Sequence, residues 1–187
     1  HSRSLFLSDK VEYLLFCVIS QAASTLPKCE GKVRNWNNCI GIRESTFGHK
    51  YVGEFLDGKF HGHGMFTYKG RKYVGQYKNH KRNGKGTYTY TNGDKYIGEW
   101  KEHKYYGDGV YFYSNGDKYI GEWNKKKFNA PDNSKERSGY GEYIYANGNK
   151  YVGEWQKGKK HGQGILTYVS GKVKKGVWKK DKFVSSK

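Results

Sequence analysis

The stretch Tyr96-Ile97-Gly98-Glu99-Trp100, followed by Gly107-x-Gly109, decides the fold of this chain because it recurs. Each further copy leads to its own Gly-x-Gly pair, and the copies begin at Tyr51, Tyr73, Tyr119 and Tyr151. A unit this short cannot bury its own apolar face, so the units have to stack on their neighbours. The sequence therefore predicts a repeat array.

The composition indicates what holds such an array together. The 187 residues suit one domain and include 26 glycines and 18 tyrosines, with 17% aromatic residues overall. Glycine at this frequency disfavours helix, because each interior helical glycine costs about 1 kcal/mol. We expect aromatic rings to supply the apolar surface and glycines to allow close backbone approach.

Alternation along a strand decides which residues of the repeat share a face. Tyr96, Gly98 and Trp100 point one way, whereas Ile97 and Glu99 point the other. The sequence thus predicts one face on which rings cover glycines. This face is also a conceivable stacking platform for sugars or bases, although a covered ring layer is the simpler interpretation.

Turn signals join the repeats into hairpins. The segment 91–94, Thr-Asn-Gly-Asp, predicts a three-residue loop with Gly93 in the left-handed region, which pairs Tyr88 with Tyr96. The first repeat is one residue shorter. Its segment Lys69-Gly70 predicts a two-residue turn that pairs Phe66 with Tyr73, so the rings stay on the same face.

The pattern Tyr-x-Gly-x-Trp/Phe followed by Gly-x-Gly resembles the MORN repeat family from about Tyr51 to Trp178. The resemblance implies an all-β fold, a single-layer twisted antiparallel meander of MORN β-hairpin repeats in an elongated array. The residues expected to carry this structure are Tyr51, Gly53, Tyr73, Gly75, Tyr96, Gly98, Trp100, Tyr119, Gly121, Trp123, Tyr151, Gly153 and Trp155.

The first 24 residues differ from the array. An apolar run, Leu14 to Ile19, is followed by small residues up to Ser24, which indicates a signal peptide at 1–24. The alternative is an N-terminal strand or short helix of the fold. A signal implies an exported protein of the bacterial periplasm, the cell surface or the medium.

The three cysteines fit this interpretation. Removal of a signal takes Cys17 with it and leaves Cys29 and Cys39, which would form a disulfide in an oxidising compartment. Closure of so short a loop contributes about 3 kcal/mol. We expect residues 25–50 to form a disulfide-capped lead-in and a degenerate half-repeat, similar to the lead-in of exported bacterial MORN proteins.

The array itself is predicted over 51–187, with an insertion at 124–138. Fifteen residues separate Trp123 from Gly139, where six are usual, and the insertion contains Pro131 and several charges. This composition favours an exposed loop. It is either a functional finger or a tolerated insertion, and such insertions cost little.

No catalytic constellation emerges. The recurring acids Glu54, Glu99, Glu122 and Glu154 are spread one per repeat, whereas an acid–base pair must flank one bond. His61-x-His63 is too small a set of ligands to hold a metal firmly. The sequence predicts no enzyme activity, no cofactor and no metal.

Basic residues are expected along both edges of the array, and the formal net charge is +18. The long-loop edge carries the candidate anion- or lipid-binding residues Lys59, Lys81, Arg82, Lys104, Lys125, Lys126, Lys127, Lys159 and Lys160. The tight-turn edge carries Arg71, Lys72, Lys95, Lys118, Lys150 and Lys172. We call these two sets the basic edges.

Three functions from different classes fit these features. The first is a non-catalytic module that docks on an acidic protein or an anionic membrane surface through the basic edges. The second is a cell-wall or glycan binder that uses the aromatic face. The third is a scaffold that associates with itself, as a homodimer, or with a partner. Nucleic acid is disfavoured by the expected export.

Overall fold

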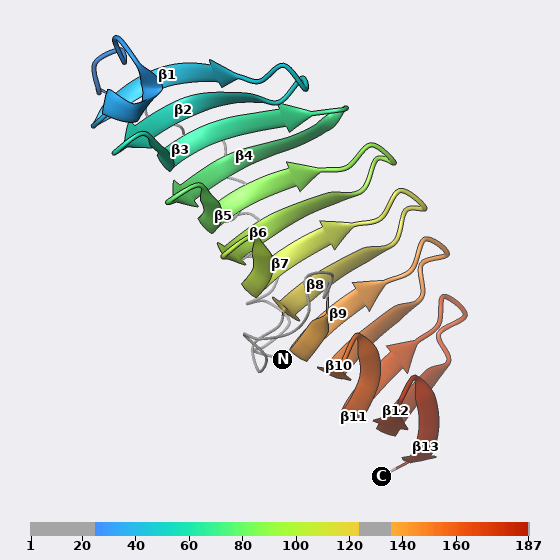
Figure 1. Ribbon diagram of the computed structural model, residues 1–187. Helices are drawn as coiled ribbons and strands as arrows, with labels where there is room; N and C mark the ends of the chain where they lie inside the picture. The colour runs from blue at the N-terminus through green and yellow to red at the C-terminus, as the bar shows by residue number, and fades with distance from the viewer. Residues whose placement is uncertain (1–24, 124–135, 187) are drawn as a thin grey trace. The chain divides into compact units, whose positions relative to one another are not determined.

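The computed structural model describes residues 25–123 and 136–186. The described residues fall into two compact units, an N-terminal unit that ends at His103 and a C-terminal unit that begins at Lys104. The predicted signal peptide and residues 124–135 of the predicted insertion lie outside the described residues. Each unit is a single layer of antiparallel strands (Figure 1).

The N-terminal unit contains a short 3₁₀ helix, η1 (Val33–Asn35), and six strands paired in sequence order. The strands are β1 (Cys39–Glu44), β2 (Lys50–Leu56), β3 (Lys59–Tyr68), β4 (Arg71–Lys78), β5 (Lys81–Thr89) and β6 (Lys95–Lys101).

The C-terminal unit contains seven strands among its described residues, again paired in sequence order. They are β7 (Lys104–Phe112), β8 (Lys118–Trp123), β9 (Arg137–Ile144), β10 (Lys150–Gln156), β11 (Lys159–Thr167), β12 (Val173–Lys179) and β13 (Lys182–Ser186). The fold class expected from the sequence, an antiparallel meander of β-hairpin repeats, is confirmed.

The predicted registers are also present. Tyr88 pairs with Tyr96 across the β5–β6 hairpin, and Gly93 in its loop has φ 89°. The shorter turn before β4 pairs Phe66 with Tyr73, and Gly70 has φ 75°. Both turn lengths therefore keep the rings on one face of the sheet.

A layer of rings forms the core. Tyr51, Tyr73 and Tyr119 are at most 1% exposed, and neighbouring rings meet edge to face, as where the centroids of Tyr73 and Tyr77 lie 5.1 Å apart. Each of these tyrosines lies over two paired glycines. A Cβ on Gly64 would lie 2.5 Å from Cζ of Tyr51, so only glycine fits beneath the ring. The glycine interpretation of the repeat is confirmed at this position.

Hydrogen bonds fix the polar ends of the same rings. Each repeat tyrosine donates its hydroxyl proton to the carbonyl three residues later; for Tyr73 this acceptor is Gln76, at 3.0 Å. A β-bulge after Gly75 shifts the register of β4 against β5 at this point. The indole N–H of Trp100 donates to the Gly86 carbonyl at 3.1 Å. The hydroxyl and indole groups of the repeated rings thus satisfy buried backbone carbonyls.

The acidic position of the repeat has a structural role. From the sequence these acids were interpreted only as one charge per repeat. Glu154 accepts the backbone N–H of Gln163 at 3.0 Å, and Gln76 accepts that of Lys85 at 2.8 Å. Each acceptor serves the residue between the two glycines of a Gly-x-Gly pair. Because Gln76 does this as an amide, the position requires an acceptor and not a charge.

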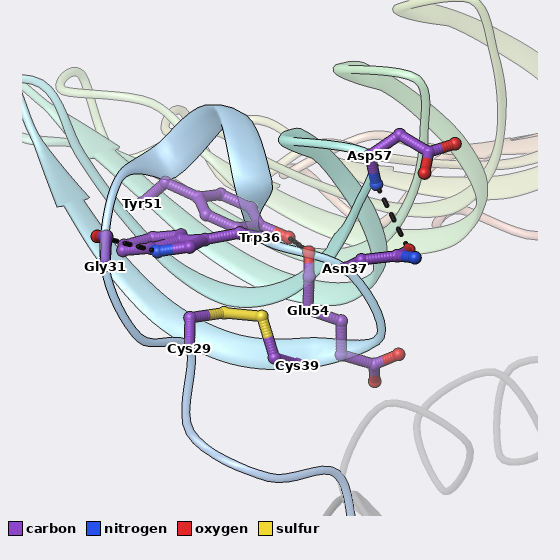
Figure 2. The surroundings of a disulfide bond; sticks show 8 residues. All are labelled: Cys29, Gly31, Trp36, Asn37, Cys39, Tyr51, Glu54 and Asp57. Atoms are coloured by element: carbon purple, nitrogen blue, oxygen red, sulfur yellow. Dashed lines mark hydrogen bonds between the residues drawn. A yellow bond between two sulfur atoms is a disulfide. The ribbon is translucent and has the colours of Figure 1, made fainter.

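The lead-in covers the outer edge of β1 (Figure 2). Cys29 and Cys39 form the expected disulfide, with their Cα atoms 5.0 Å apart. Lys28 forms a parallel bridge with Ile40, and the Trp36 ring lies over Gly41 with its centroid 4.7 Å from that of Phe55. The segment therefore pairs with an otherwise open strand edge and supplies a ring to the core.

The strands differ from the sequence expectation in two places. Strand β9 begins at Arg137, so the last two residues of the predicted insertion, Arg137 and Ser138, belong to a strand. The chain also forms β13 after the last repeat, with Phe183 paired to Trp178. Sequence reasoning missed this strand because it carries no Tyr-x-Gly-x-Trp pattern.

Candidate docking surfaces

The basic edges of the N-terminal unit are exposed. Lys59 and Lys81 lie at the long-loop edge, and Lys81 Nζ lies 3.3 Å from a carboxylate oxygen of Glu102. Both partners of this pair are about half exposed, so it contributes little to stability and leaves the lysine accessible. Arg71 and Lys72 are exposed at the tight-turn edge.

The C-terminal unit places its basic residues similarly. Lys159 and Lys172 are exposed, whereas Lys104, Lys118 and Lys150 are half-buried. Lys150 Nζ lies 3.5 Å from a carboxylate oxygen of Glu142. The candidate residues Lys125, Lys126 and Lys127 lie outside the described residues.

Two candidate edge residues lie over the rings instead. The guanidinium carbon of Arg82 lies 4.5 Å from the centroid of Trp100, and Lys160 Nζ lies 4.9 Å from that of Trp178. Arg137, which sequence reasoning did not select, takes the same position 4.4 Å from Trp155. Each cation is the first or second residue of its strand and lies opposite a ring in the register, a signal that could have identified all three.

The long loops expected from the sequence at this edge are two-residue turns in the structure, such as Asn79-His80 between the paired residues Lys78 and Lys81, because the strands continue to the edge. Successive turns are linked to one another. His80 Nδ1 accepts the backbone N–H of Phe60 at 3.1 Å, and Asp181 accepts that of Lys160 at 2.9 Å. Partial burial lowers the pKa of His80, and the nearby Arg43 and Lys59 cations lower it further, which keeps the imidazole neutral and able to accept. This histidine therefore has a structural role. The described residues contain no cluster of metal-binding side chains.

Two groups of residues in the ring layer share one plan, and we call them the Arg71 cell and the Asp117 cell. In each cell a cation lies over three rings, two of which are paired tyrosines. The Arg71 cell, in the N-terminal unit, consists of Arg71, Tyr73, Arg82, Tyr88 and Trp100. The Asp117 cell, in the C-terminal unit, consists of Asp117, Tyr119, Arg137, Tyr143 and Trp155.

Asp117 closes its cell with hydrogen bonds. One carboxylate oxygen accepts the Tyr143 hydroxyl proton at 2.6 Å, and the other accepts the Ala146 backbone N–H at 2.7 Å. Partial burial by itself would raise the pKa of the Asp117 carboxyl. The hydrogen bonds from Tyr143, Ala146 and Asn115, together with the Arg137 charge, outweigh this effect and lower the pKa below its usual 3.8.

The Arg71 cell opens into a groove of about 200 Å³ on the ring face. Tyr68, Tyr77 and Phe60 form part of its lining, and Arg71, Lys72 and Arg82 contribute three cations. The histidines His80 and His103 also line it, and no carboxylate does. The groove can thus hold an anionic group beside aromatic surface.

Among the described residues, no helix is long and apolar enough to cross a bilayer. No curated protein sequence matches the chain. Among solved structures, it is similar to the TCP domain of Drosophila melanogaster SAS-4 (dCPAP), solved in complex with a proline-rich motif of Ana2 (dSTIL). That similarity has 14% sequence identity and a TM-score of 0.31, and it covers 86% of this chain and 99% of the other.

The sequence profile of the MORN repeat matches five segments that together make up more than half of the chain. They are residues 51–70, 73–95, 96–118, 135–150 and 151–173. The matched segments coincide with the hairpins that carry the ring layer, and repeats of this kind support binding or scaffold modules. The chain belongs to the MORN repeat family.

Proposed function

We propose that this protein is a non-catalytic docking module that holds acidic partners through its basic edges. The observation that supports the proposal most is the position of the exposed cations Lys59, Lys81, Arg71 and Lys159, each of which is the first residue of its strand. A partner surface can reach them without disturbing the core. The formal net charge of +18 acts in the same direction.

The magnitude is sufficient for reversible docking. A basic residue near an anionic surface contributes about 1 kcal/mol, so six contacts can hold the protein with a Kd of tens of micromolar. Screening shortens the interaction to about 8 Å at physiological ionic strength, so binding has to weaken as salt rises. An acidic protein and an anionic membrane surface both satisfy this description.

The burial of the ring layer favours docking through the basic edges and disfavours a glycan-binding role of the aromatic face. Tyr73 and Tyr151 are at most 1% exposed, and Trp155 is 5% exposed, because each ring is covered by the next ring or by a cation. Rings that are covered in this way have no free face on which a sugar could stack. Half-buried rings remain both in the groove of the Arg71 cell, such as Phe66 and Tyr88, and outside it, such as Tyr140 and Tyr168.

Export to an oxidising compartment is the second part of the proposal, and the disulfide between Cys29 and Cys39 supports it. We expect the secreted protein to begin between Ala23 and Leu26 and to carry no free thiol at these two cysteines. Intact-mass analysis with alkylation, before and after reduction, checks both points. Retention of residues 1–20 in secreted material would contradict the export proposal.

A charge-matched pair of variants tests the docking function. The double change Lys59→Gln with Lys159→Gln removes two edge charges, whereas Lys85→Gln with Lys175→Gln removes two charges from the strand faces. Flotation with phosphatidylserine vesicles and retention on immobilised polyglutamate provide the two acidic surfaces. We expect at least one of them to bind in a salt-dependent manner.

The edge variant should bind this surface at least fivefold more weakly than the native protein, and the face variant less than twofold. Equal losses in the two variants would show that net charge, and not the edges, carries the binding. The absence of binding to both surfaces at low salt would contradict the docking function itself.

A further inference from the structure

The Arg71 cell and the Asp117 cell differ at one register position. Arg71 and Asp117 each stand two residues before the repeat tyrosine, and each lies across the turn from a tyrosine, Tyr68 or Tyr113. The two turns also approach the following turn in the same way. A Cβ added to Gly70 would lie 3.2 Å from the Thr91 methyl, and a Cβ added to Gly116 would lie 3.2 Å from the Ala146 Cβ. The donors that surround the two positions therefore correspond.

The donors that Asp117 satisfies have no acceptor in the Arg71 cell. Tyr88 corresponds to Tyr143, because each pairs with the repeat tyrosine of the preceding strand, and Thr91 corresponds to Ala146. Within the described part of the chain, neither the Tyr88 hydroxyl nor the Thr91 backbone N–H has a hydrogen-bond acceptor. Arg71 cannot serve, because a guanidinium has donors only.

The electrostatic difference has the same direction. In the Asp117 cell a carboxylate lies near the Arg137 guanidinium. In the Arg71 cell the corresponding Arg82 faces a groove that carries two further cations, Arg71 and Lys72, and no carboxylate. The Arg71 cell thus has both the donors and the positive charge of a carboxylate site that the chain itself does not fill.

We propose that the groove of the Arg71 cell binds a carboxylate side chain of an acidic protein segment, which takes the place that Asp117 occupies in the other cell. The carboxylate accepts the Tyr88 hydroxyl proton and the Thr91 N–H, and Arg71 supplies the charge-assisted contact. The neighbouring rings, Tyr68 and Phe66, cover the apolar atoms of the bound segment. This site makes the acidic partner of the proposed function a protein.

A protein segment fits the groove better than a bilayer surface does. The acceptor that fills the matched cell is an aspartate on a peptide turn, so the required ligand is a carboxylate on a short stem. The groove is lined by aromatic rings that an extended segment can contact along its length, whereas lipid headgroups in a flat bilayer reach the strand ends first. The edges can thus attract a partner, and the groove can select it.

Two synthetic peptides serve as probes: acetyl-Gly-Asp-Gly-Asp-Gly-amide and its analogue with asparagine at both aspartate positions. We expect the aspartate peptide to shift the Thr91 amide resonance of the full chain saturably in NMR titrations. The asparagine peptide should bind at least tenfold more weakly, because it lacks the charge that Arg71 recognises. Phosphatidylserine nanodiscs test the lipid source on the same resonance.

Variants separate the site from the fold. Arg71→Asp supplies the missing carboxylate internally, so we expect it to stay folded, to abolish peptide binding and to move the Thr91 amide toward its peptide-bound position. Arg71→Gln removes the charge without filling the site and should weaken binding several-fold. Equal binding of the two peptides, or unchanged binding by Arg71→Asp, would overturn the proposal. A Thr91 response to nanodiscs but not to peptide would overturn the choice of a protein partner.

The outcome is independent of the docking test above. The edge variant Lys59→Gln with Lys159→Gln leaves Arg71, Tyr88 and Thr91 in place, so its Thr91 response to the aspartate peptide should persist. If that response persists while binding to acidic surfaces is unaffected by the edge changes, the edges fail and the groove stands. If the edges bind and the peptide does not, the groove fails and the docking function stands.

Discussion

The Arg71 cell and the Asp117 cell have the same ring framework, yet one is closed by its own carboxylate and the other is open. In both cells an arginine lies over a paired tyrosine. The guanidinium carbon lies 4.9 Å from the ring centroid between Arg82 and Tyr88, and 5.0 Å between Arg137 and Tyr143. Among the five residues that define each cell, only the one two positions before the repeat tyrosine differs in kind, and the turn before Arg71 is one residue shorter than the turn before Asp117. A repeat can therefore keep its fold while it exchanges an internal acceptor for a cation that an external ligand can use.

The largest expected effect tests what the two cells share. Gly86→Val in the N-terminal unit and Gly141→Val in the C-terminal unit each place a side chain under a tyrosine ring, since a Cβ would lie 2.5 Å from Tyr73 Cζ or 2.7 Å from Tyr119 Cζ. Each change should destabilise the protein by about 2–3 kcal/mol, measured by urea unfolding.

Lys78→Val at an exposed strand end is the control and should change stability by less than about 0.5 kcal/mol. An unchanged urea midpoint for either glycine variant would show that the ring does not lie over that glycine. A loss in one unit alone would end the claim of a shared framework.

The next effect tests what separates the cells. Asp117→Ala leaves the Tyr143 hydroxyl and the Ala146 N–H without their acceptor and removes the carboxylate near Arg137, so we expect a loss of about 2 kcal/mol. The matched change Arg71→Ala breaks no corresponding hydrogen bond and should alter stability by less than about 0.5 kcal/mol. Thermal unfolding at pH 7 measures both. Similar losses in the two variants would contradict the distinction between a closed and an open cell.

Lowering the pH should weaken the Asp117 cell alone, because it protonates the Asp117 carboxylate. Its pKa in the folded protein lies below the usual 3.8, so its stabilisation is present above that pH and is lost as the pH falls through the lower folded value. The partly exposed site limits the effect to about 1 kcal/mol. Hydrogen exchange of the Ala146 amide, corrected for the intrinsic rate, should accelerate relative to the Thr91 amide as the pH falls from 5 to 3. Equal behaviour of the two amides would contradict the assignment of Asp117 as the acceptor.

The smallest expected effect concerns a feature that both units share. Gln76→Glu and Glu154→Gln exchange the two acceptors of the Gly-x-Gly backbone, so each should change the free energy of unfolding by less than about 0.5 kcal/mol. Gln76→Ala removes the acceptor of the Lys85 N–H and should cost about 1 kcal/mol, which urea unfolding can resolve. A large loss for Glu154→Gln would show that its charge, and not its acceptor capacity, matters.

Sequence periodicity by itself determined the strands around the Tyr-x-Gly-x-Trp and Gly-x-Gly motifs, the registers across the turns between Gly-x-Gly and the next repeat tyrosine, and the face that carries the rings. Alternation places Tyr96, Gly98 and Trp100 on one face, and turn length fixes which residues oppose each other. These properties depend on neighbours within one hairpin, so the order of residues contains them. The pairing of Cys29 with Cys39 was accessible because removal of Cys17 with the predicted signal peptide leaves these two cysteines as the remaining pair.

Only the tertiary structure decided which charges are available to a partner. Arg82 was assigned to an edge from its place in a loop, but its guanidinium lies over Trp100, on the next strand of the sheet. Strand β13 depends on backbone pairing with β12, and its side chains carry no repeat signal.

The contrast between Arg71 and Asp117 depends on contacts between successive turns, such as that from Asp117 to Ala146, 29 residues away. A repeat sequence specifies each hairpin through local contacts. What one hairpin offers to the next, and what it leaves for a ligand, is set by side chains that meet only when the hairpins are stacked.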